Sequence, residues 1–234
     1  QGDESMSGPT TAMIMAAGFG TRMGALTAST PKPLLPVAGR ALIDHALDYC
    51  AAAGVTRHVI NLHYLGGQIR DHLATRDDVV FSEEAEILET GGCVTHALPL
   101  LGDTPVYTVN SDAIFVGPPA LPVLANAWWP DEMDALLLMV RRKAAIAYTR
   151  AGDFGLEGRR PVRRGEAATA PYVYSGAQII RPEAFADAPK GAFSTNVIWD
   201  RLNAKGKLAA VVYDGAWVDV GTPEGLKLAD EALT

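Results

Sequence analysis

Short apolar runs alternate with amphipathic stretches along the first half of the chain. Thr11–Ala16 is an apolar run that ends in small residues, which predicts a buried strand. Ala41–Ala53 carries apolar residues at helical spacing and is followed by Gly54, a signal for the end of a helix. The same criteria predict strands at Arg57–Leu62, Val79–Ser82, Val106–Val109 and Ala135–Val140, and helices at Leu65–Thr75, Gly91–Leu101 and Pro118–Trp128.

The second half of the chain is less regular. Thr195–Ala204 and Pro223–Leu233 are predicted helices, the latter because a proline follows Thr222 at a favoured helix start. Arg159–Arg164 is basic and contains a proline, which predicts a solvated loop. Strands are predicted at Tyr172–Ile180, Leu208–Tyr213 and Trp217–Val220.

Alternation of strands and helices predicts the fold class, which is an α/β protein with a Rossmann-like, mostly parallel mixed sheet flanked by helices. Ligands of such sheets bind beyond the carboxyl ends of the strands. Gly18–Gly24 and Asn110–Asp112 both follow predicted strands. We therefore expect these two segments to lie on the same rim of the sheet.

Composition and charge exclude several classes of protein. Hydrophobic residues make up 48% and charged residues 20% of the chain, as in ordinary globular proteins. The net charge of −7 argues against nucleic acid as a partner. Cys50 and Cys93 lie in apolar runs and are expected to be reduced core thiols. With no signal peptide and no long apolar segment in the sequence, we expect a cytoplasmic protein without a membrane partner.

Residues 12–40 form a positive stretch in this acidic protein, because they include Arg22, Lys32 and Arg40 but no Asp or Glu. The loop Ala16–Met23 follows a predicted strand, and its small residues allow backbone amides to approach a phosphate closely. A dinucleotide-binding loop would have glycine where Met23 stands, and the Walker pattern is absent. The loop therefore predicts a phosphate site of another type.

A stiff frame surrounds Lys32, which lies between Pro31 and Pro33. Proline fixes its own φ and disfavours the helical conformation in the residue before it. We therefore expect an extended Lys32 whose ammonium group is held at a fixed place, close to the glycine loop.

Taken together, these motifs resemble those of the sugar-1-phosphate nucleotidyltransferases. Ala16–Met23 and Pro31–Leu34 match the two signature segments, and further matches are Leu88–Gly92, Val109–Asp112, Tyr174–Gly176 and Trp217–Thr222. The spacing is most similar to that of the compact bacterial N-acetylmuramate α-1-phosphate uridylyltransferases, with mannose-1-phosphate guanylyltransferases next. The resemblance implies a fold of the nucleotide-diphospho-sugar transferase type.

The resemblance also implies the reaction, in which a nucleoside triphosphate and a sugar 1-phosphate give a nucleotide sugar and pyrophosphate. Arg22 would hold the β- and γ-phosphates and Lys32 the α-phosphate, while Asp112 and Asp219 would bind Mg²⁺. The implied nucleotide contacts are Ala16, Ala17, Gly18, Gly20, Thr21, Glu84, Glu89, Thr90 and Gly91. The implied sugar contacts are Tyr174, Ser175, Gly176 and Asn196, although Gly91 also suits a helix start, Tyr174 a core position and Asn196 a helix cap.

Two questions stay open at this level. Larger thymidylyltransferase relatives use a second lysine in a Glu-Lys-Pro stretch for the sugar phosphate, and this chain has no such stretch. Either metal and backbone suffice, or an arginine from Arg159–Arg164 supplies the charge. The base and sugar are also open, because a mannose-1-phosphate guanylyltransferase, a cytidylyltransferase for a small phospho-alcohol and a silent nucleotide-sugar sensor are alternatives.

The expected organisation has one catalytic domain. Residues 1–11 are predicted to be a tag-like, disordered start and residues 12–234 a single nucleotidyltransferase domain. Its nucleotide-binding half covers about 12–140 and its sugar-binding half about 141–234. We expect a monomer or a small homo-oligomer.

Overall fold

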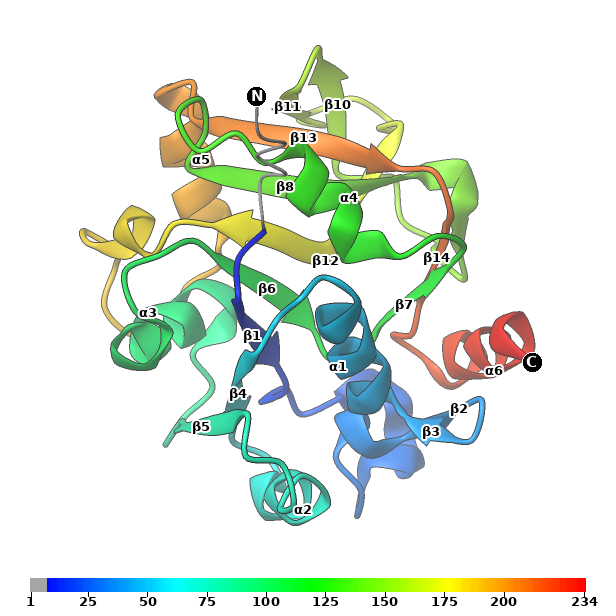
Figure 1. The fold of residues 1–234 in the computed structure, drawn as a ribbon. Helices are drawn as coiled ribbons and strands as arrows, with labels where there is room; N and C mark the ends of the chain where they lie inside the picture. Colours follow the sequence, from blue (N-terminus) through cyan, green and yellow to red (C-terminus); the bar gives the residue numbers. More distant parts are fainter. Residues whose placement is uncertain (1–7) are drawn as a thin grey trace, which may run out of the picture.

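The computed structural model describes residues 8–234 (Figure 1). Most of the predicted tag-like start, residues 1–7, therefore lies outside the described residues. Thr11 is the first residue of β1 (Thr11–Met15).

Four parallel strands form the first part of a nine-stranded central sheet. β1 lies between β4 (Arg57–Leu62) and β6 (Val106–Asn110), and β5 (Val79–Glu83) pairs with β4 at the edge. All four strands therefore end at the same rim, as the alternating sequence pattern predicts.

The rest of the sheet is mixed. β12 (Tyr172–Ile180) runs antiparallel between β6 and β8 (Ala135–Arg141), and β13 (Leu208–Tyr213) pairs in parallel with β8. A break in the β12–β8 register between Tyr174 and Gln178 marks a bulge. The predicted fold class, a mostly parallel mixed sheet flanked by helices, is confirmed.

Helices cover both faces of the sheet (Figure 1). α1 (Leu42–Ala52) and α4 (Ala120–Ala127) pack on one face, and α3 (Glu89–Leu101) and α5 (Asn196–Ala204) pack on the other. One apolar cluster lies between the sheet and α1 and α4, and a second lies between the sheet and α3 and α5. Successive side chains of β8 point alternately into the first and the second cluster, which explains its unbroken apolar sequence.

A small second sheet lies beside the carboxyl end of β6. β7 (Ala113–Val116) pairs antiparallel with β14 (Ala216–Asp219), which pairs in parallel with β9 (Ala145–Ile146). α6 (Pro223–Leu233) packs against this sheet through a third apolar cluster. The β7–β14 pair matters for the site, because Asp219 lies opposite Ala113, the residue after Asp112.

The prediction of a solvated loop at Arg159–Arg164 is wrong. Residues 160–163 form strand β11 (Arg160–Arg163), which makes a hairpin with β10 (Phe154–Glu157) around Gly158 at φ 60°. β11 is an edge strand of the sheet, where proline and arginine are tolerated because only one side of the strand pairs with another strand among residues 8–234.

Other differences from the predicted elements are small. α2 (Gly66–His72) is shorter than the predicted helix Leu65–Thr75, and α3 begins at Glu89 instead of Gly91. The two-residue strands β2 (Pro36–Val37) and β3 (Arg40–Ala41) are too short for a periodic signal. None of the helices within residues 8–234 is long and apolar enough to cross a membrane.

Candidate active site

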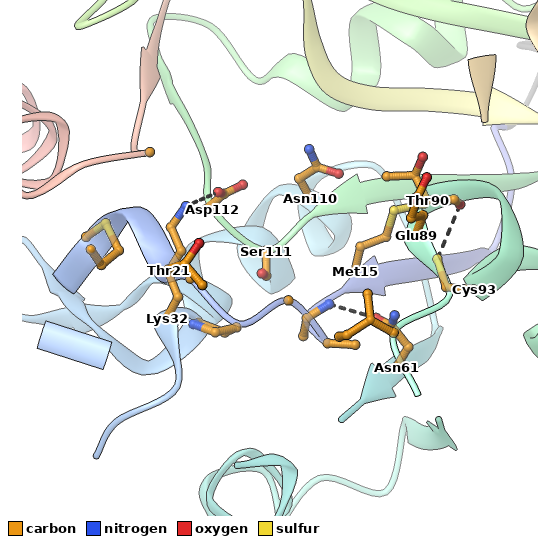
Figure 2. Close-up of a pocket in the computed structure, with 18 of the residues that line it drawn as sticks. Met15, Thr21, Lys32, Asn61, Glu89, Thr90, Cys93, Asn110, Ser111 and Asp112 are labelled. Carbon is orange, nitrogen blue, oxygen red and sulfur yellow. Dashed lines mark hydrogen bonds and ion pairs between the residues drawn. The ribbon is translucent and has the colours of Figure 1, made fainter. Parts of the chain in front are cut away.

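A cavity of about 360 Å³ opens at the carboxyl ends of β1, β4 and β6 (Figure 2). We call it the first cavity. It brings together most of the residues that the sequence assigns to the nucleotide and its phosphates. They are Ala16, Ala17, Gly18, Gly20, Thr21, Arg22, Lys32, Glu84, Glu89, Thr90 and Asp112.

The glycine loop leaves β1 and turns into a 3-10 helical segment at Thr21–Thr27. Gly20 has φ 64°, and a Cβ there would lie 3.1 Å from the Cβ of Lys32. A larger residue would therefore be strained and would press on Lys32. This close approach sets the glycine loop directly against the Pro-Lys-Pro segment.

A buried polar chain holds the start of this loop. The Ala16 amide donates to Asn61 Oδ1 at 2.7 Å, and Asn61 Nδ2 donates to Glu84 Oε1 at 2.7 Å (Figure 2 shows the first bond). Burial raises the pKa of the Glu84 carboxyl, and the hydrogen bonds from Asn61 and the Leu88 amide oppose that rise. The chain of donors and acceptors therefore fixes the orientation of the Asn61 amide.

Lys32 forms an ion pair with Asp112, and Figure 2 shows the two side chains pointing toward each other. The expected extended conformation of Lys32 is wrong, because Lys32–Leu34 forms a single 3-10 turn. Amides of Leu34 and Leu35 donate to the carbonyls of Pro31 and Lys32 at 2.9 and 3.0 Å. The frame is thus stiff because of these turn hydrogen bonds, and the Lys32 side chain is only 12% exposed.

Arg22 lies in the first turn after the glycine loop and lines two cavities. Its guanidinium group packs over Gly221, where a Cβ would lie 2.7 Å from Arg22 Nη1. The absence of a side chain at Gly221 therefore leaves room for this cation.

A second cavity of about 510 Å³ adjoins the first and overlaps it at Met15, Arg22, Thr90, Asn110 and Asp112. Among the residues that the sequence assigns to the sugar, Tyr174, Gly176 and Asn196 line this second cavity. The two cavities therefore meet at these five residues, and Asp112 is the carboxylate among them.

Two of the assigned residues take other positions. Ser175 is 1% exposed and is not among the residues that line the second cavity. The Gly91 amide donates to the Phe193 carbonyl at 2.8 Å, and Gly91 does not line the first cavity. A Cβ at Gly91 would lie 2.3 Å from the Phe193 ring, so this glycine permits close packing between α3 and the segment before α5.

Tyr174 and Asn196 also make structural contacts. The Tyr174 ring packs edge-on against Trp199 at 4.7 Å, and burial raises the pKa of the Tyr174 hydroxyl. Asn196 is the first residue of α5 and not its cap, because Thr195 holds the cap position. The Asn196 Oδ1 accepts a hydrogen bond from Arg163 at 2.9 Å. Both residues therefore support the wall of the second cavity, whatever else they bind.

Asp219 lines the second cavity and reaches it through the β7–β14 pair, which places Asp219 beside the segment that carries Asp112. Within residues 8–234, no group of three or more His, Cys, Asp or Glu side chains is arranged to hold a metal ion. Two carboxylates bordering one cavity nevertheless fit Mg²⁺, which commonly takes one or two protein carboxylates and completes its shell with phosphate oxygens and water.

Two residues of the site are absent from the predictions made from the sequence. Arg150 lines the second cavity, and its Nη2 lies 3.3 Å from Asp219 Oδ2. Asn61 lines the first cavity and is 3% exposed. Asn61 could have been found as a polar residue near the end of an apolar strand, whereas Arg150 stands in an irregular stretch with no signal.

The cysteines match their prediction. Cys50 and Cys93 are both free and buried, and burial raises the pKa of each thiol to about 12. Cys93 lines the first cavity but donates to the Thr90 carbonyl, which is typical of a structural thiol.

The fold and the two adjoining cavities define a nucleotidyltransferase. Residues 12–155 match the model of the MobA-like NTP transferase domain, and the chain belongs to this family. The chain is 42% identical to the N-acetylmuramate alpha-1-phosphate uridylyltransferase of Caulobacter vibrioides, over 96% of both chains. It is 36% identical to the enzyme of the same name from Neisseria meningitidis serogroup B, over 93% of this chain and 96% of that one.

Solved structures share the fold. A putative glucose-1-phosphate thymidylyltransferase from Bacillus anthracis superposes with a TM-score of 0.82 over 94% of both chains, at 18% identity. At that identity the likeness concerns the architecture alone. It agrees with a mixed sheet that has a parallel core and helices on both faces.

Proposed function

We propose that this protein transfers a uridylyl group from UTP to N-acetylmuramate α-1-phosphate, giving UDP-N-acetylmuramate and pyrophosphate. The observation that carries the reaction type is the meeting of two cavities at Asp112, with Lys32 and Arg22 beside it. Support for this base and sugar is the 42% identity with the Caulobacter vibrioides uridylyltransferase. Such a product would serve the recycling of cell-wall sugars in the cytoplasm.

The chemistry requires positioning more than proton transfer. An oxygen of the sugar phosphate attacks the α-phosphorus of UTP, and the bond from that phosphorus to the bridging oxygen of the pyrophosphate breaks. The second pKa of a phosphomonoester is about 6, so the nucleophile is already ionised at neutral pH. The site therefore needs no general base, but it must hold two polyanions in line.

The cations of the first cavity meet this requirement. Lys32 lies at the junction of the cavities and neutralises the α-phosphate as charge develops on it. Arg22 lies beside Gly221 and holds the β- and γ-phosphates that leave as pyrophosphate. Backbone amides of the loop from Ala17 to Thr21 bind phosphate oxygens, and Ala16 borders the cavity with its own amide held by Asn61. Glu84, Glu89 and Thr90 border the place of the base and ribose.

Asp112 and Asp219 are the residues that would hold Mg²⁺, and nucleotidyltransferases of this kind are typically metal-dependent. When bound, the ion supplies positive charge and fixed geometry to the phosphates of both substrates. Two carboxylates beside a triphosphate would otherwise repel it.

Pyrophosphate release tests the proposal. The protein is incubated with each of the four nucleoside triphosphates against N-acetylmuramate 1-phosphate, N-acetylglucosamine 1-phosphate, glucose 1-phosphate and mannose 1-phosphate. We expect UTP with N-acetylmuramate 1-phosphate to exceed GTP at least about tenfold in kcat/KM, a difference of about 1.4 kcal/mol. Equal or better turnover of GTP with mannose 1-phosphate would refute the proposed substrates, and no release with any pair would refute the enzyme.

A further inference from the structure

The second cavity is rich in arginine although the protein is acidic. Arg22, Arg150, Arg163 and Arg164 line it. A sugar 1-phosphate brings a charge of about −1.5 to −2 into such a site at neutral pH. These arginines are therefore candidates for binding the phosphate of the sugar.

Two of the four arginines are held by their own surroundings. Arg163 donates hydrogen bonds to Asn196 and to Asp200 at 2.9 Å, and its guanidinium group lies over the Trp199 ring. Arg164 donates to the Ala167 carbonyl at 2.8 Å. Arg22 packs over Gly221 on the side shared with the first cavity. Arg150 is the arginine whose side chain contacts a carboxylate assigned to the metal.

The position of Arg150 is defined by three contacts. Its Nη2 lies 3.3 Å from Asp219 Oδ2, its guanidinium carbon lies 4.7 Å above the centre of the Tyr148 ring, and its backbone carbonyl accepts from Arg142 Nε at 3.2 Å. The side chain is 59% exposed, so it can change partner without crossing a packed core.

The ion pair Arg150–Asp219 resembles the pair Lys32–Asp112 at the other side of the junction. In each pair, a carboxylate suited to a metal ion neutralises a cation suited to a phosphate. Bound ligands reverse these pairings, because a divalent cation takes the carboxylates and the phosphates take the cations. Because Arg150 is largely exposed, its pair with Asp219 contributes little to stability, and exchanging that pairing costs little.

We propose that Arg150 binds the phosphate of the sugar 1-phosphate, and that it leaves Asp219 for this phosphate when Asp219 takes up the divalent cation. This inference rests on the proposed transferase reaction. It gives Arg150 the role that a second lysine has in larger relatives, from a different position in the chain.

Two effects of opposite sign follow for Arg150→Gln. Binding of the sugar 1-phosphate should weaken about 10- to 100-fold, because a charge-assisted hydrogen bond to the phosphate is lost. Binding of a divalent cation to the free protein should become tighter by up to about fivefold, because Asp219 no longer has a competing cation. A purely structural role for Arg150 would weaken both.

Calorimetry on the intact protein separates these effects. Mn²⁺ alone is titrated into the free protein. N-acetylmuramate 1-phosphate is titrated in the presence of Mg²⁺ and a UTP analogue whose link between the α- and β-phosphorus cannot be cleaved. The matched control is Arg141→Gln, since Arg141 forms an exposed ion pair with Asp214 at 3.0 Å and lines neither of the two cavities. Arg164→Gln is measured in parallel, and thermal unfolding verifies the fold of each variant.

Weaker sugar phosphate binding together with tighter Mn²⁺ binding, seen in Arg150→Gln and not in Arg141→Gln, supports the inference. Unchanged sugar phosphate binding in Arg150→Gln, or a loss confined to Arg164→Gln, overturns it. If the wild type ignores N-acetylmuramate 1-phosphate but binds another sugar 1-phosphate, the proposed substrate fails and Arg150 is tested with that ligand. If it binds no sugar phosphate, both proposals fail.

Discussion

Asp112 and Asp219 are predicted to act as a unit on one metal ion, and paired substitutions test this. They stand far apart in the sequence, and the β7–β14 register brings them to one cavity. Asp112→Asn and Asp219→Asn each remove one negative charge while keeping the size of the side chain. The double variant completes the cycle.

The magnitude follows from the charges in the site. Two unit charges about 4 Å apart interact by about 4 kcal/mol at the effective dielectric typical of such sites. Loss of either metal ligand should therefore cost about 3–4 kcal/mol in the transition state, a fall in kcat of roughly 10²- to 10³-fold. If both residues serve one ion, the second substitution removes little more, so the coupling energy should itself be about 3–4 kcal/mol.

The assay is pyrophosphate release as a function of Mg²⁺ for the wild type, both single variants and the double variant. Fold stability should change by no more than about 1 kcal/mol in Asp219→Asn, because its partner Arg150 is 59% exposed. It should fall further in Asp112→Asn, because the mostly buried Lys32 then lacks its partner. Losses that add fully in the double variant, or an unchanged Mg²⁺ dependence in Asp219→Asn, would refute a shared ion.

Three further substitutions probe other parts of the site. Lys32→Ala should raise the activation free energy by about 3–5 kcal/mol, which lowers kcat roughly 10²- to 10⁴-fold, and near-normal turnover would leave the Pro-Lys-Pro turn a structural role only. Gly221→Ala should raise the KM for UTP about tenfold, because the new Cβ displaces the flexible end of Arg22. The Tm should stay unchanged, and an unaltered KM would contradict this prediction. Burial raises the pKa of Glu84, so the folded wild type loses stability as pH rises through that pKa. Glu84→Gln should therefore have the higher Tm near pH 8 and an equal Tm near pH 4, and a constant difference would be inconsistent with this reading.

Most of the central sheet could be predicted from the sequence because its strands are buried on both faces. β4, β12 and β13 have the predicted bounds, since segments rich in apolar and β-branched residues with clear ends leave little ambiguity. The hairpin of β10 and β11 was missed because an edge strand carries arginine and proline without a clean alternation.

The site was predictable where special backbone geometry leaves a mark in the sequence. Gly20 and the Pro31–Pro33 segment are such marks, and both lie beside Lys32 in the structure. Contacts between side chains that only the tertiary structure brings together leave no such mark in the sequence. Arg150 meets Asp219 because β9 and β14 pair, and a two-residue strand gives no periodic signal.

The fate of the phosphates of UTP tests the central claim most directly, namely that the site directs attack at the α-phosphorus. The wild-type protein is incubated with N-acetylmuramate 1-phosphate and Mg²⁺, together with UTP radiolabelled at either the α- or the γ-phosphate, and the products are separated by chromatography. The account predicts that the α-label enters the nucleotide sugar and that the γ-label appears in pyrophosphate. Transfer of the γ-label to the sugar, or release of the γ-label as inorganic phosphate, would contradict it.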